Sequence, residues 1–410
     1  MKLNVCMILY WPHYQSEMRL DPQVEICSYL RHFGHQITWI MWGADQRAIE
    51  PFNFDGIKIY ITPDTKYLPN NWPFAGTLNL IPNTLRRMKI IHKILHQEKF
   101  DIVFVRDFAF DGIVAACNTK KNKTPFVFQL TNPLEQFWEA FSIEIPKPLR
   151  FFNYLAIKFH YFLATKLLQK ADLILSISEW YKEKLVAKGF PESKILVYPS
   201  GVGLNQFIDT NSVEVRNRYG LEGYQTAIYI GTMAKVRHLD ILIKAFKLVV
   251  TKKNAKLLMI GEGSDVFNLK RLTAALGLED RIIFTGQIAQ KEIPSFIAAA
   301  DIGISPVPPM PFFKLSSPIK LFEYMALAKP VVANEEIPEH SEVLRQSNAG
   351  FLVPYTPEAF AQAIIQLFDN PEKAAEMGRM GREWVIKNRS FEVLAHQVEA
   401  KFLELLGQTK

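Results

Sequence analysis

The sequence predicts an α/β fold divided into two domains, each with a parallel sheet covered by helices. The chain has 410 residues, of which 49% are hydrophobic, so it is too long for one ordinary core and too apolar for disorder. Apolar runs typical of buried strands alternate with helix-like segments from end to end. Near the midpoint Pro199 and Gly201 interrupt this alternation, because proline cannot continue a central strand and glycine permits a sharp change of direction.

The first domain is predicted for residues 1–203. Its opening strand, Asn4 to Leu9, leads into a helix with Asp21 as N-cap and Pro22 in its first turn, and Gly34 ends that helix. Further strands are predicted at His35 to Met41, Ile57 to Ile61, Ile102 to Val105, Phe126 to Leu130, Leu173 to Ser176 and Ile195 to Tyr198.

The second domain is predicted for residues 204–388 and repeats the alternation. Its strands are expected at Ala227 to Ile230, Leu257 to Ile260, Ile282 to Thr285, Ile302 to Ser305, Val331 to Ala333 and Phe351 to Val353. A last helical stretch, Phe391 to Leu406 within residues 389–410, follows all of the strands. That order leaves it free to cross back to the first domain.

Charge and cysteine content restrict the function classes. The net charge of +7 belongs mainly to residues 1–200, which hold 24 Lys and Arg against 18 Asp and Glu, whereas residues 201–410 hold 24 against 23. The basic excess of this half of the chain suits an anionic acceptor or a membrane surface and does not imply binding of nucleic acid. The three cysteines, Cys6, Cys27 and Cys117, fit neither a metal site nor a disulfide framework, which favours a reducing compartment.

Targeting and membrane signals are weak. Met1 to Trp11 has the character of a buried first strand and lacks the features of a signal peptide, and no uncharged apolar stretch is long enough to cross a bilayer. We therefore expect a cytoplasmic protein, with peripheral attachment to the inner membrane face as an open alternative. Ile145 to Lys170 has five basic residues, no acidic ones and many aromatics. This composition fits a helix on an anionic membrane face, or equally a long helix with a solvated basic side.

A glycine turn follows the strand Ala227 to Ile230 and holds the first candidate site residues. Its residues are Gly231-Thr232-Met233-Ala234-Lys235-Val236-Arg237. Loops at the carboxyl ends of parallel strands line the ligand crevice, and their backbone N–H groups bind anions. Arg237 is the candidate that neutralises a diphosphate, since its planar guanidinium binds phosphate oxygens in pairs; Lys235 is its competitor. A simple solvated arginine is the alternative.

A second glycine turn, with Gly261 and Gly263, follows the strand Leu257 to Ile260. It lacks the third glycine of the dinucleotide fingerprint, so it supports close backbone approach and little more.

The most informative segment runs from Ser316 to Val332, with the sequence SSPIKLFEYMALAKPVV. Ser317 is a suitable N-cap and Pro318 a suitable first residue of a helix whose amino end, with Ile319, attracts phosphate. Lys320 and Glu323 share one face of this helix. Glu323 is a candidate for binding ribose hydroxyls while Lys320 offsets its charge, and a plain ion pair within the helix is the alternative.

Taken together, these segments resemble the family 4 retaining glycosyltransferases of the GT-B fold, in which two Rossmann-like domains face each other across a cleft. The resemblance covers nearly the whole chain. It rests on Phe100 to Arg106 (FDIVFVR), Ala171 to Ser178 (ADLILSIS), Lys194 to Val202 (KILVYPSGV), the Gly231 loop and Lys320 to Val332.

The resemblance implies the partners and the roles of residues. It implies a nucleotide-sugar donor bound by the second domain, a glycan or lipid-linked acceptor held by the first, and transfer with retained configuration without a metal or another cofactor. Arg237 stands where the family usually has a phosphate-binding lysine, Glu323 matches the ribose-binding glutamate, and Gln287 with Ile288 matches the base-binding stretch. In the family's usual mechanism the acceptor hydroxyl attacks from the leaving-group side and a phosphate oxygen takes its proton. The donor expected on this basis is linked to UDP or GDP.

Three positions depart from the family pattern. Thr232 replaces an arginine that often follows the loop glycine, and Leu315 replaces the first glutamate of a pair that commonly contacts the sugar. Asn132 lies where many relatives have a histidine near the sugar, and it is our candidate for a hydrogen-bonding replacement. Arg237, Lys320 and Asn132 are thus the predicted catalytic residues. Two other functions remain open: a nucleotide-sugar epimerase on the same fold, and a non-catalytic sugar-nucleotide-binding protein.

Overall fold

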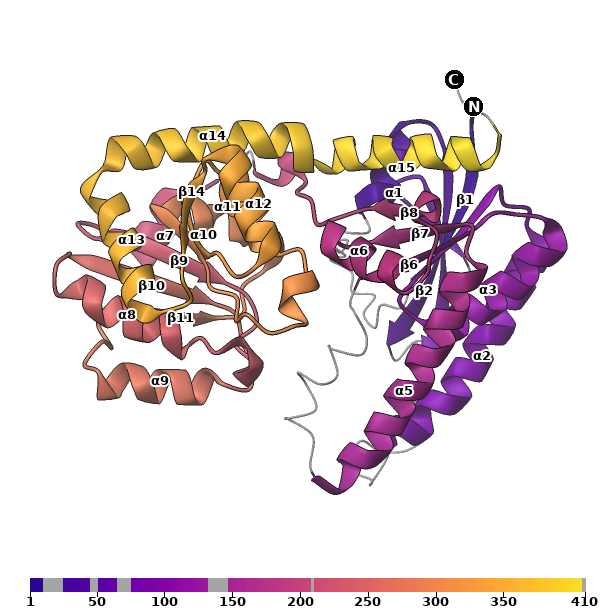
Figure 1. The fold of residues 1–410 in the computed structure, drawn as a ribbon, viewed down its shortest axis with the longest axis horizontal. Helices are drawn as coiled ribbons and strands as arrows, with labels where there is room; N and C mark the ends of the chain where they lie inside the picture. Colours follow the sequence, from indigo (N-terminus) through magenta and orange to yellow (C-terminus); the bar gives the residue numbers. More distant parts are fainter. Residues whose placement is uncertain (10–24, 45–50, 65–74, 132–146, 208–209, 408–410) are drawn as a thin grey trace. The chain divides into compact units, whose positions relative to one another are not determined.

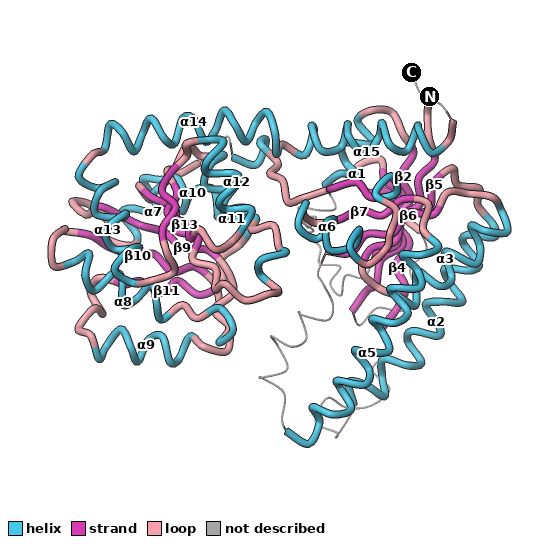
Figure 2. The backbone as a smooth tube through the Cα atoms, viewed as in Figure 1, coloured by secondary structure: helices cyan, strands magenta, loops and turns pink. Residues whose placement is uncertain are grey.

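The computed structural model describes residues 1–9, 25–44, 51–64, 75–131, 147–207 and 210–407. The chain divides into two compact units, the first made of Met1–Pro199 with Leu394–Lys410 and the second of Ser200–Val393 (Figure 1). Each unit is a parallel sheet with helices packed against it (Figure 2), which confirms the predicted α/β class with two Rossmann-like domains.

The first unit contains an eight-stranded sheet in the order β3-β4-β2-β1-β5-β6-β7-β8. All neighbouring strands are parallel except β3 and β4, which form an antiparallel pair at one edge. The strands are β1 (Asn4–Leu9), β2 (Gln36–Ala44), β3 (Phe52–Phe54), β4 (Ile57–Asp64), β5 (Ile102–Arg106), β6 (Phe126–Leu130), β7 (Leu173–Ser176) and β8 (Ile195–Val197).

The short strand β3 is an element that the sequence analysis did not predict. Asp55 and Gly56, both with positive φ, form the turn between β3 and β4. Two of its three residues, Asn53 and Phe54, are exposed, so the apolar run that marks a buried strand is missing here.

The helices of the first unit include two long ones, α2 and α5, that both pack against α3. The helices are α1 (Glu25–His32), α2 (Ala75–Gln97), α3 (Ala109–Asn122), α5 (Lys147–Lys170), α6 (Glu179–Ala187), the short 3-10 turn η2 (Glu192–Lys194) and α15 (Phe391–Leu405). Asp21 and Pro22, the predicted start of the first helix, lie outside the described residues.

The terminal helix α15 joins the first unit from residue Leu394 onward. His35 Nε2 lies 2.9 Å from Glu399 Oε1, and the rings of Phe33 and His396 stack with centroids 4.0 Å apart. The last helical stretch therefore returns to the first domain, as its place after all of the strands allows.

The second unit contains a six-stranded sheet in the order β11-β10-β9-β12-β13-β14, in which all pairs are parallel. The strands are β9 (Gln225–Ile230), β10 (Ala255–Ile260), β11 (Ile282–Gly286), β12 (Ile302–Ser305), β13 (Val331–Asn334) and β14 (Gly350–Val353). The chain runs outward from β9 to β11 and then returns to the other side of β9, so the order of strands reverses between β9 and β12. In open α/β sheets such a reversal marks the ligand crevice at the carboxyl ends of the strands.

Helices cover both faces of this second sheet and bury two apolar clusters against it. The helices are α7 (Ser212–Arg218), α8 (Asp240–Val250), α9 (Val266–Ala275), α10 (Ile293–Ala299), α11 (Ile319–Ala326), α12 (Pro338–Ser347), α13 (Pro357–Asp369) and α14 (Pro371–Arg389). Short 3-10 turns are η3 (Leu204–Phe207), η4 (Lys235–Arg237), η5 (Gln290–Glu292) and η6 (Phe313–Leu315).

Tyr324 of α11 holds strands β9 and β12 at the point where they separate. The two strands pair only at Ile302 with Ala227 and at Gly303 with Ile228. Beyond this the Tyr324 hydroxyl, which is fully buried, accepts a 3.0 Å hydrogen bond from the Ile230 N–H and donates one of 3.4 Å to the Ile304 carbonyl. A Cβ at position 303 would lie 2.4 Å from the Tyr324 ring, so only glycine admits this side chain.

We predict that Tyr324→Phe lowers the free energy of unfolding by about 1–3 kcal/mol, because the buried Ile230 N–H then loses its acceptor. Urea denaturation measures the change. The matched control is Tyr355→Phe, since the Tyr355 hydroxyl makes an exposed 3.3 Å bond to the His238 carbonyl. Equal effects of the two substitutions would contradict the special role of Tyr324.

Candidate functional site

Three glycine-containing loops meet at the carboxyl ends of β9, β10 and β11. The Gly231 N–H donates to the Ile260 carbonyl at 2.9 Å, and the Gly261 N–H donates to the Gly286 carbonyl at 3.0 Å. The Met233 N–H donates to the Glu262 carbonyl at 2.8 Å. The loops are thus held as one surface at the carboxyl ends of these strands.

Glycine at position 261 is required by the close approach of two of these loops. Its φ of +129° is rare for residues with a side chain, and a Cβ here would lie 2.2 Å from the Gly231 carbonyl oxygen. Gly263 has a similar constraint, because its Cβ would lie 2.4 Å from the Met233 carbonyl carbon. The close approach predicted for this second glycine turn therefore occurs between two loops of the protein itself.

Arg237 lies at the end of the turn η4, half-buried against an aromatic ring. Its guanidinium carbon is 4.6 Å from the centroid of the Phe313 ring. Burial lowers the pKa of Arg237, and the Tyr229 hydroxyl opposes that shift. Lys235, the competing cation in the same loop, is exposed. Of the two cations in this loop, Arg237 is therefore the one whose side chain is held by packing.

Lys320 reaches back from the first turn of α11 to the end of β9. Its Nζ lies 4.1 Å from the centroid of the fully buried Tyr229 ring and 3.1 Å from the point where a Gly231 Cβ would stand. Burial, and secondarily the Arg237 charge, holds the pKa of Lys320 well below its usual value, while Glu323 acts in the opposite direction. Burial also raises the pKa of Tyr229 to about 12, so this ring presents a neutral face to the lysine.

The two cations lack nearby carboxylate partners within the described part of the chain. Arg237 and Lys320 form no ion pair with a carboxylate there, so the simple ion pair of Lys320 with Glu323 does not form, although the Glu323 charge favours the protonated form of Lys320. Two like charges that repel each other in a partly desolvated position are costly unless an anion accompanies them. The arrangement suits a diphosphate, which carries negative charge on both phosphates.

The predicted helix cap at Ser317 is wrong. Helix α11 begins at Ile319, Pro318 occupies the N-cap position, and no side chain caps the helix. The Ser317 hydroxyl instead accepts a 3.0 Å hydrogen bond from the Ser200 N–H, and the Ser200 hydroxyl donates to the Ser317 carbonyl at 2.8 Å. Ser317 is buried and engaged within the protein, whereas Ile319 and Lys320 form the start of the helix near the crevice.

The remaining predicted residues occupy several positions. Thr232 is exposed and its carbonyl accepts from the Tyr229 hydroxyl at 3.2 Å. Glu323 is half-buried on the same helix as Lys320. Gln287, which is exposed, and Ile288 follow β11 directly. Asn132 lies outside the described residues.

A buried polar network behind this edge of the sheet was missed by the sequence analysis. His340 Nε2 lies 3.1 Å from Ser305 Oγ, and His340 Nδ1 lies 3.1 Å from the Asn334 carbonyl. Burial lowers the pKa of His340 to about 3, so the ring is neutral. Glu339, the residue before His340, is also fully buried. Burial raises its pKa to about 7, and Arg389, whose Nη2 lies 3.1 Å from Glu339 Oε1, opposes that shift.

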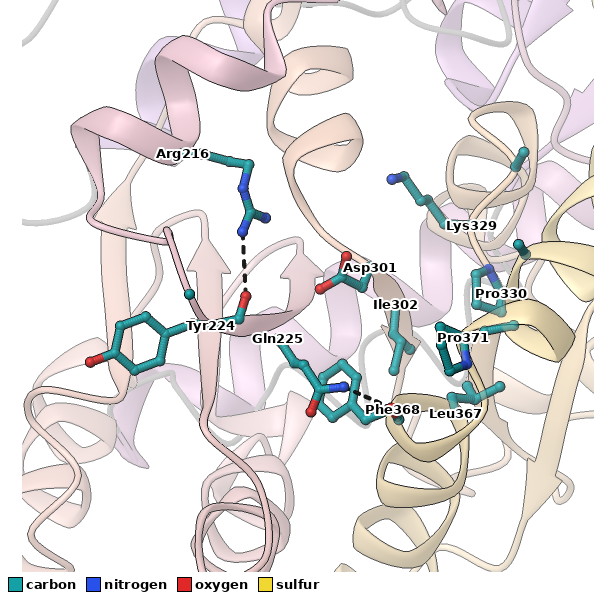
Figure 3. Close-up of a pocket in the computed structure, with 14 residues that line it drawn as sticks. Arg216, Tyr224, Gln225, Asp301, Ile302, Lys329, Pro330, Leu367, Phe368 and Pro371 are labelled. Atoms are coloured by element: carbon teal, nitrogen blue, oxygen red, sulfur yellow. Dashed lines mark hydrogen bonds between the residues drawn. The ribbon is translucent and has the colours of Figure 1, made fainter.

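A cavity of about 570 Å³ in the second unit lies away from the predicted donor site (Figure 3). It opens beside the amino ends of β9 and β12, at Gln225 and Ile302. Its charged groups already bind the backbone: Arg216 donates to the Ala299 and Leu221 carbonyls, and Lys329 to the Ala298 carbonyl. This cavity therefore does not contain the residues that the sequence analysis predicts for the donor, which follow the carboxyl ends of the strands.

The described residues lack both a membrane-spanning helix and a cluster of metal-binding side chains. They include no helix long and apolar enough to cross a membrane. They also include no group of three or more His, Cys, Asp or Glu side chains arranged to hold a metal ion.

The shifted pKa values of Glu339 and His340 predict a specific dependence of stability on pH. The folded state takes up a proton at Glu339 from about pH 7, but the unfolded chain only near pH 4.5, so acidification stabilises the fold through Glu339. For His340 the unfolded chain protonates near pH 6.5 but the folded state only near 3, so acidification destabilises it. The two effects offset each other between pH 6.5 and 4.5.

In Glu339→Gln the stabilising titration of Glu339 is removed, so the destabilisation caused by His340 appears alone. We expect the free energy of unfolding of this variant to fall from pH 6.5 downward by about 1.4 kcal/mol per pH unit. Urea unfolding across this range measures the slope. Glu376→Gln, which changes an exposed carboxylate on α14 that is not among the charges acting on Glu339, is the control. Parallel pH profiles for Glu339→Gln and the unmodified protein would rule out the opposing titrations.

Comparison with protein families gives one match for each unit. Residues 24–206 match the model described as Glycosyltransferase Family 4, and residues 212–384 match the model described as Glycosyl transferases group 1. The structure of Anabaena HepE in complex with UDP and glucose superposes with a TM-score of 0.69 at 16% identity, covering 98% of this chain and 100% of that one. The fold thus defines a GT-B protein. The chain belongs to the family 4 glycosyltransferases.

Curated relatives align over part of the chain. N-acetyl-α-D-glucosaminyl L-malate synthase of Bacillus anthracis is 23% identical over 59% of this chain and 62% of its own length. The GDP-mannose-dependent α-(1-6)-phosphatidylinositol monomannoside mannosyltransferase of Mycobacterium tuberculosis is 25% identical over 57% of this chain and 61% of its own. The chain thus spans somewhat less than two thirds of each relative.

Proposed function

We propose that this protein is a retaining glycosyltransferase that transfers a sugar from a nucleotide-sugar donor to a glycan or lipid-linked acceptor without a metal ion. The single observation that carries the proposal is the pair Arg237 and Lys320. Both cations stand at the reversal point of the second sheet, beside three tightly joined loops, without a carboxylate partner among the described residues.

The donor diphosphate binds between these two cations. Arg237 supplies a planar fork for phosphate oxygens, and Lys320 supplies a second charge at the start of α11. The N–H groups of the first helical turn, at Ile319 and Lys320, add donors for the same anion. Together these groups deliver the positive charge that many other transferases take from a metal ion.

The rest of the donor follows the resemblance to the family. Glu323 accepts hydrogen bonds from the ribose hydroxyls, and the backbone at Gln287 and Ile288 contacts the base. UDP and GDP are the expected nucleotides. The HepE structure contains UDP, and the mycobacterial relative is named for its dependence on GDP-mannose.

Catalysis on this proposal is stabilisation of the leaving diphosphate. Negative charge grows on the phosphate as the bond to the sugar breaks, and fixed cations in a partly desolvated site favour that state without reorganising. The acceptor hydroxyl attacks from the same side as the leaving group, and a phosphate oxygen takes its proton. The first unit holds the acceptor, and Asn132 contributes a hydrogen bond near the sugar.

A glycan or a lipid-linked sugar is the acceptor class that we propose. The basic excess of residues 1–200 favours an anionic acceptor. The mycobacterial relative, whose name specifies a phosphatidylinositol monomannoside, is consistent with a lipid-linked acceptor.

We predict that Arg237→Ala lowers kcat by roughly 100-fold, since it removes a charge that acts mainly on the transition state. Lys235→Ala, in the same turn but exposed, is the matched control and should change kcat by less than about twofold. Glu323→Ala should weaken donor binding by about tenfold because ribose contacts act before the reaction. Unchanged kinetics in both Arg237→Ala and Glu323→Ala would refute these roles.

The reaction class is tested by product analysis with a set of nucleotide sugars, with and without acceptors and with a chelator present. Transfer that continues in the chelator, with NMR showing the donor's anomeric configuration in the product, supports the proposal. A changed sugar nucleotide in the absence of any acceptor indicates an epimerase. Donor binding without turnover for every acceptor indicates a non-catalytic protein, for which Thr232 and Leu315 are the motivating departures.

A further inference from the structure

The solvent-exposed face of helix α5 consists of apolar and basic side chains. Its exposed side chains follow helical spacing along one face, and we call them the aromatic–basic face: Phe151, Tyr154, Leu155, Lys158, Phe159, Phe162 and Lys166. The opposite face is buried in the first unit, at Ile157, Ala164, Leu167 and Leu168.

The large aromatic side chains of this face are unusually exposed to solvent. Phe159 and Phe162 are 55% and 54% exposed, and Tyr154 is 53% exposed. Aromatic side chains normally bury their area in a core or an interface, so a contiguous row of them marks a binding surface. On α2, Ile81 and Leu85 are likewise each 56% exposed.

The two helices have the same sign of charge. Neither α2 nor α5 contains an acidic residue. On α5, Lys158 Nζ lies 5.4 Å from the Tyr154 ring centroid and Lys166 Nζ lies 5.7 Å from that of Phe162, so each of these lysines lies beside an aromatic ring of the same face. On α2, Lys89 and Lys93 are exposed.

Both helices belong to one side of the first unit, since each packs against α3. Their amino-terminal halves extend past the edge of the β-sheet in Figure 1. The exposed apolar residues are Ile81 and Leu85 in the amino-terminal half of α2, and on α5 they run from Phe151 to Phe162, across the middle of the helix.

We propose that the aromatic–basic face, together with Ile81 and Leu85, docks the protein on the surface of an anionic phospholipid bilayer. Aromatic rings and aliphatic side chains enter the boundary between headgroups and acyl chains, while lysines extend to the phosphates. A second copy of the chain is a poor occupant, because a symmetric contact would bring two basic helix faces together without an acidic residue on α5 to pair with their lysines. Nucleic acid is also a poor occupant, because Leu155, Ile81 and Leu85 cannot stack on bases.

The proposal adds a docking surface to the function proposed above, and it rests on that function only for the location of the acceptor. It is tested without donor or acceptor, so failure of glycosyl transfer leaves the result interpretable. The full chain is mixed with phosphatidylcholine vesicles that contain either no charged lipid or about 30% phosphatidylglycerol, at low and high salt, and sedimented.

The unmodified chain should sediment with the anionic vesicles at low salt and much less at high salt. Phe159→Ser/Phe162→Ser should weaken binding at least tenfold, and Lys158→Glu/Lys166→Glu by about fivefold or more for each lysine. Matched controls change equally exposed residues of the second unit, Val213→Ser/Phe267→Ser and Lys252→Glu/Lys270→Glu, and should bind as the unmodified chain does. Circular dichroism melts confirm that each variant is folded.

Three results would overturn the proposal. The first is an absence of binding to anionic vesicles at low salt. The second is an equal loss of binding in the controls and in the variants of the aromatic–basic face. The third is a dimer in analytical ultracentrifugation that Phe159→Ser/Phe162→Ser dissociates, which would assign this face to contact between copies of the chain.

Discussion

The separation of β9 from β12 is the constraint on which the second unit depends. Parallel strands that part at a reversal point leave backbone groups without partners, and the Tyr324 hydroxyl serves two of them at once, at Ile230 and Ile304. Its ring occupies the space that Gly303 leaves free. Because Tyr324 belongs to α11, the same contact fixes the helix that carries Lys320 and Glu323. Lys320 and Glu323 are therefore positioned by a helix that one buried side chain fixes to the sheet.

On the proposed function, Arg237 and Lys320 are placed for an anionic ligand at the expense of the stability of the ligand-free protein. Burial and the Arg237 charge both disfavour protonation of Lys320, the Glu323 charge favours it, and neither cation forms an ion pair with a carboxylate among the described residues. Elsewhere in the structure the protein neutralises buried charge: Arg87 binds Asp111 at 2.8 Å, and Arg389 binds Glu339. The contrast is the physical reason to assign Arg237 and Lys320 to an anion.

Local sequence signals predicted the fold because parallel strands buried on both faces are continuous apolar runs. Phe126–Leu130 and Ile302–Ser305 have the predicted bounds. The strand β3 was missed since its side chains are largely exposed. Ser317 satisfied every local rule for an N-cap, but Ser200, 117 residues away, takes its hydroxyl. Local rules cannot detect such a distant competitor.

Arg237 and Lys320 could be selected as candidates from the sequence because their charge and their position, after a strand and at the start of a helix, can both be read locally. Residues that act through distant packing could not be selected in this way. Tyr324, His340 and Glu339 lie in ordinary amphipathic helices, and nothing in their local pattern distinguishes them from core or surface positions. Only the fold brings His340 to Ser305 and Glu339 to Arg389.

The most direct measurement of the central claim compares melting temperatures of the unmodified protein and Lys320→Met, each alone and with UDP, GDP, ADP or the corresponding nucleosides. If the lysine is an unneutralised cation held for a diphosphate, Lys320→Met melts higher than the unmodified protein without ligand. It should also lose the stabilisation that one nucleoside diphosphate, but not its nucleoside, gives the unmodified protein. A lower melting temperature for ligand-free Lys320→Met, with nucleotide stabilisation unchanged, would contradict the claim.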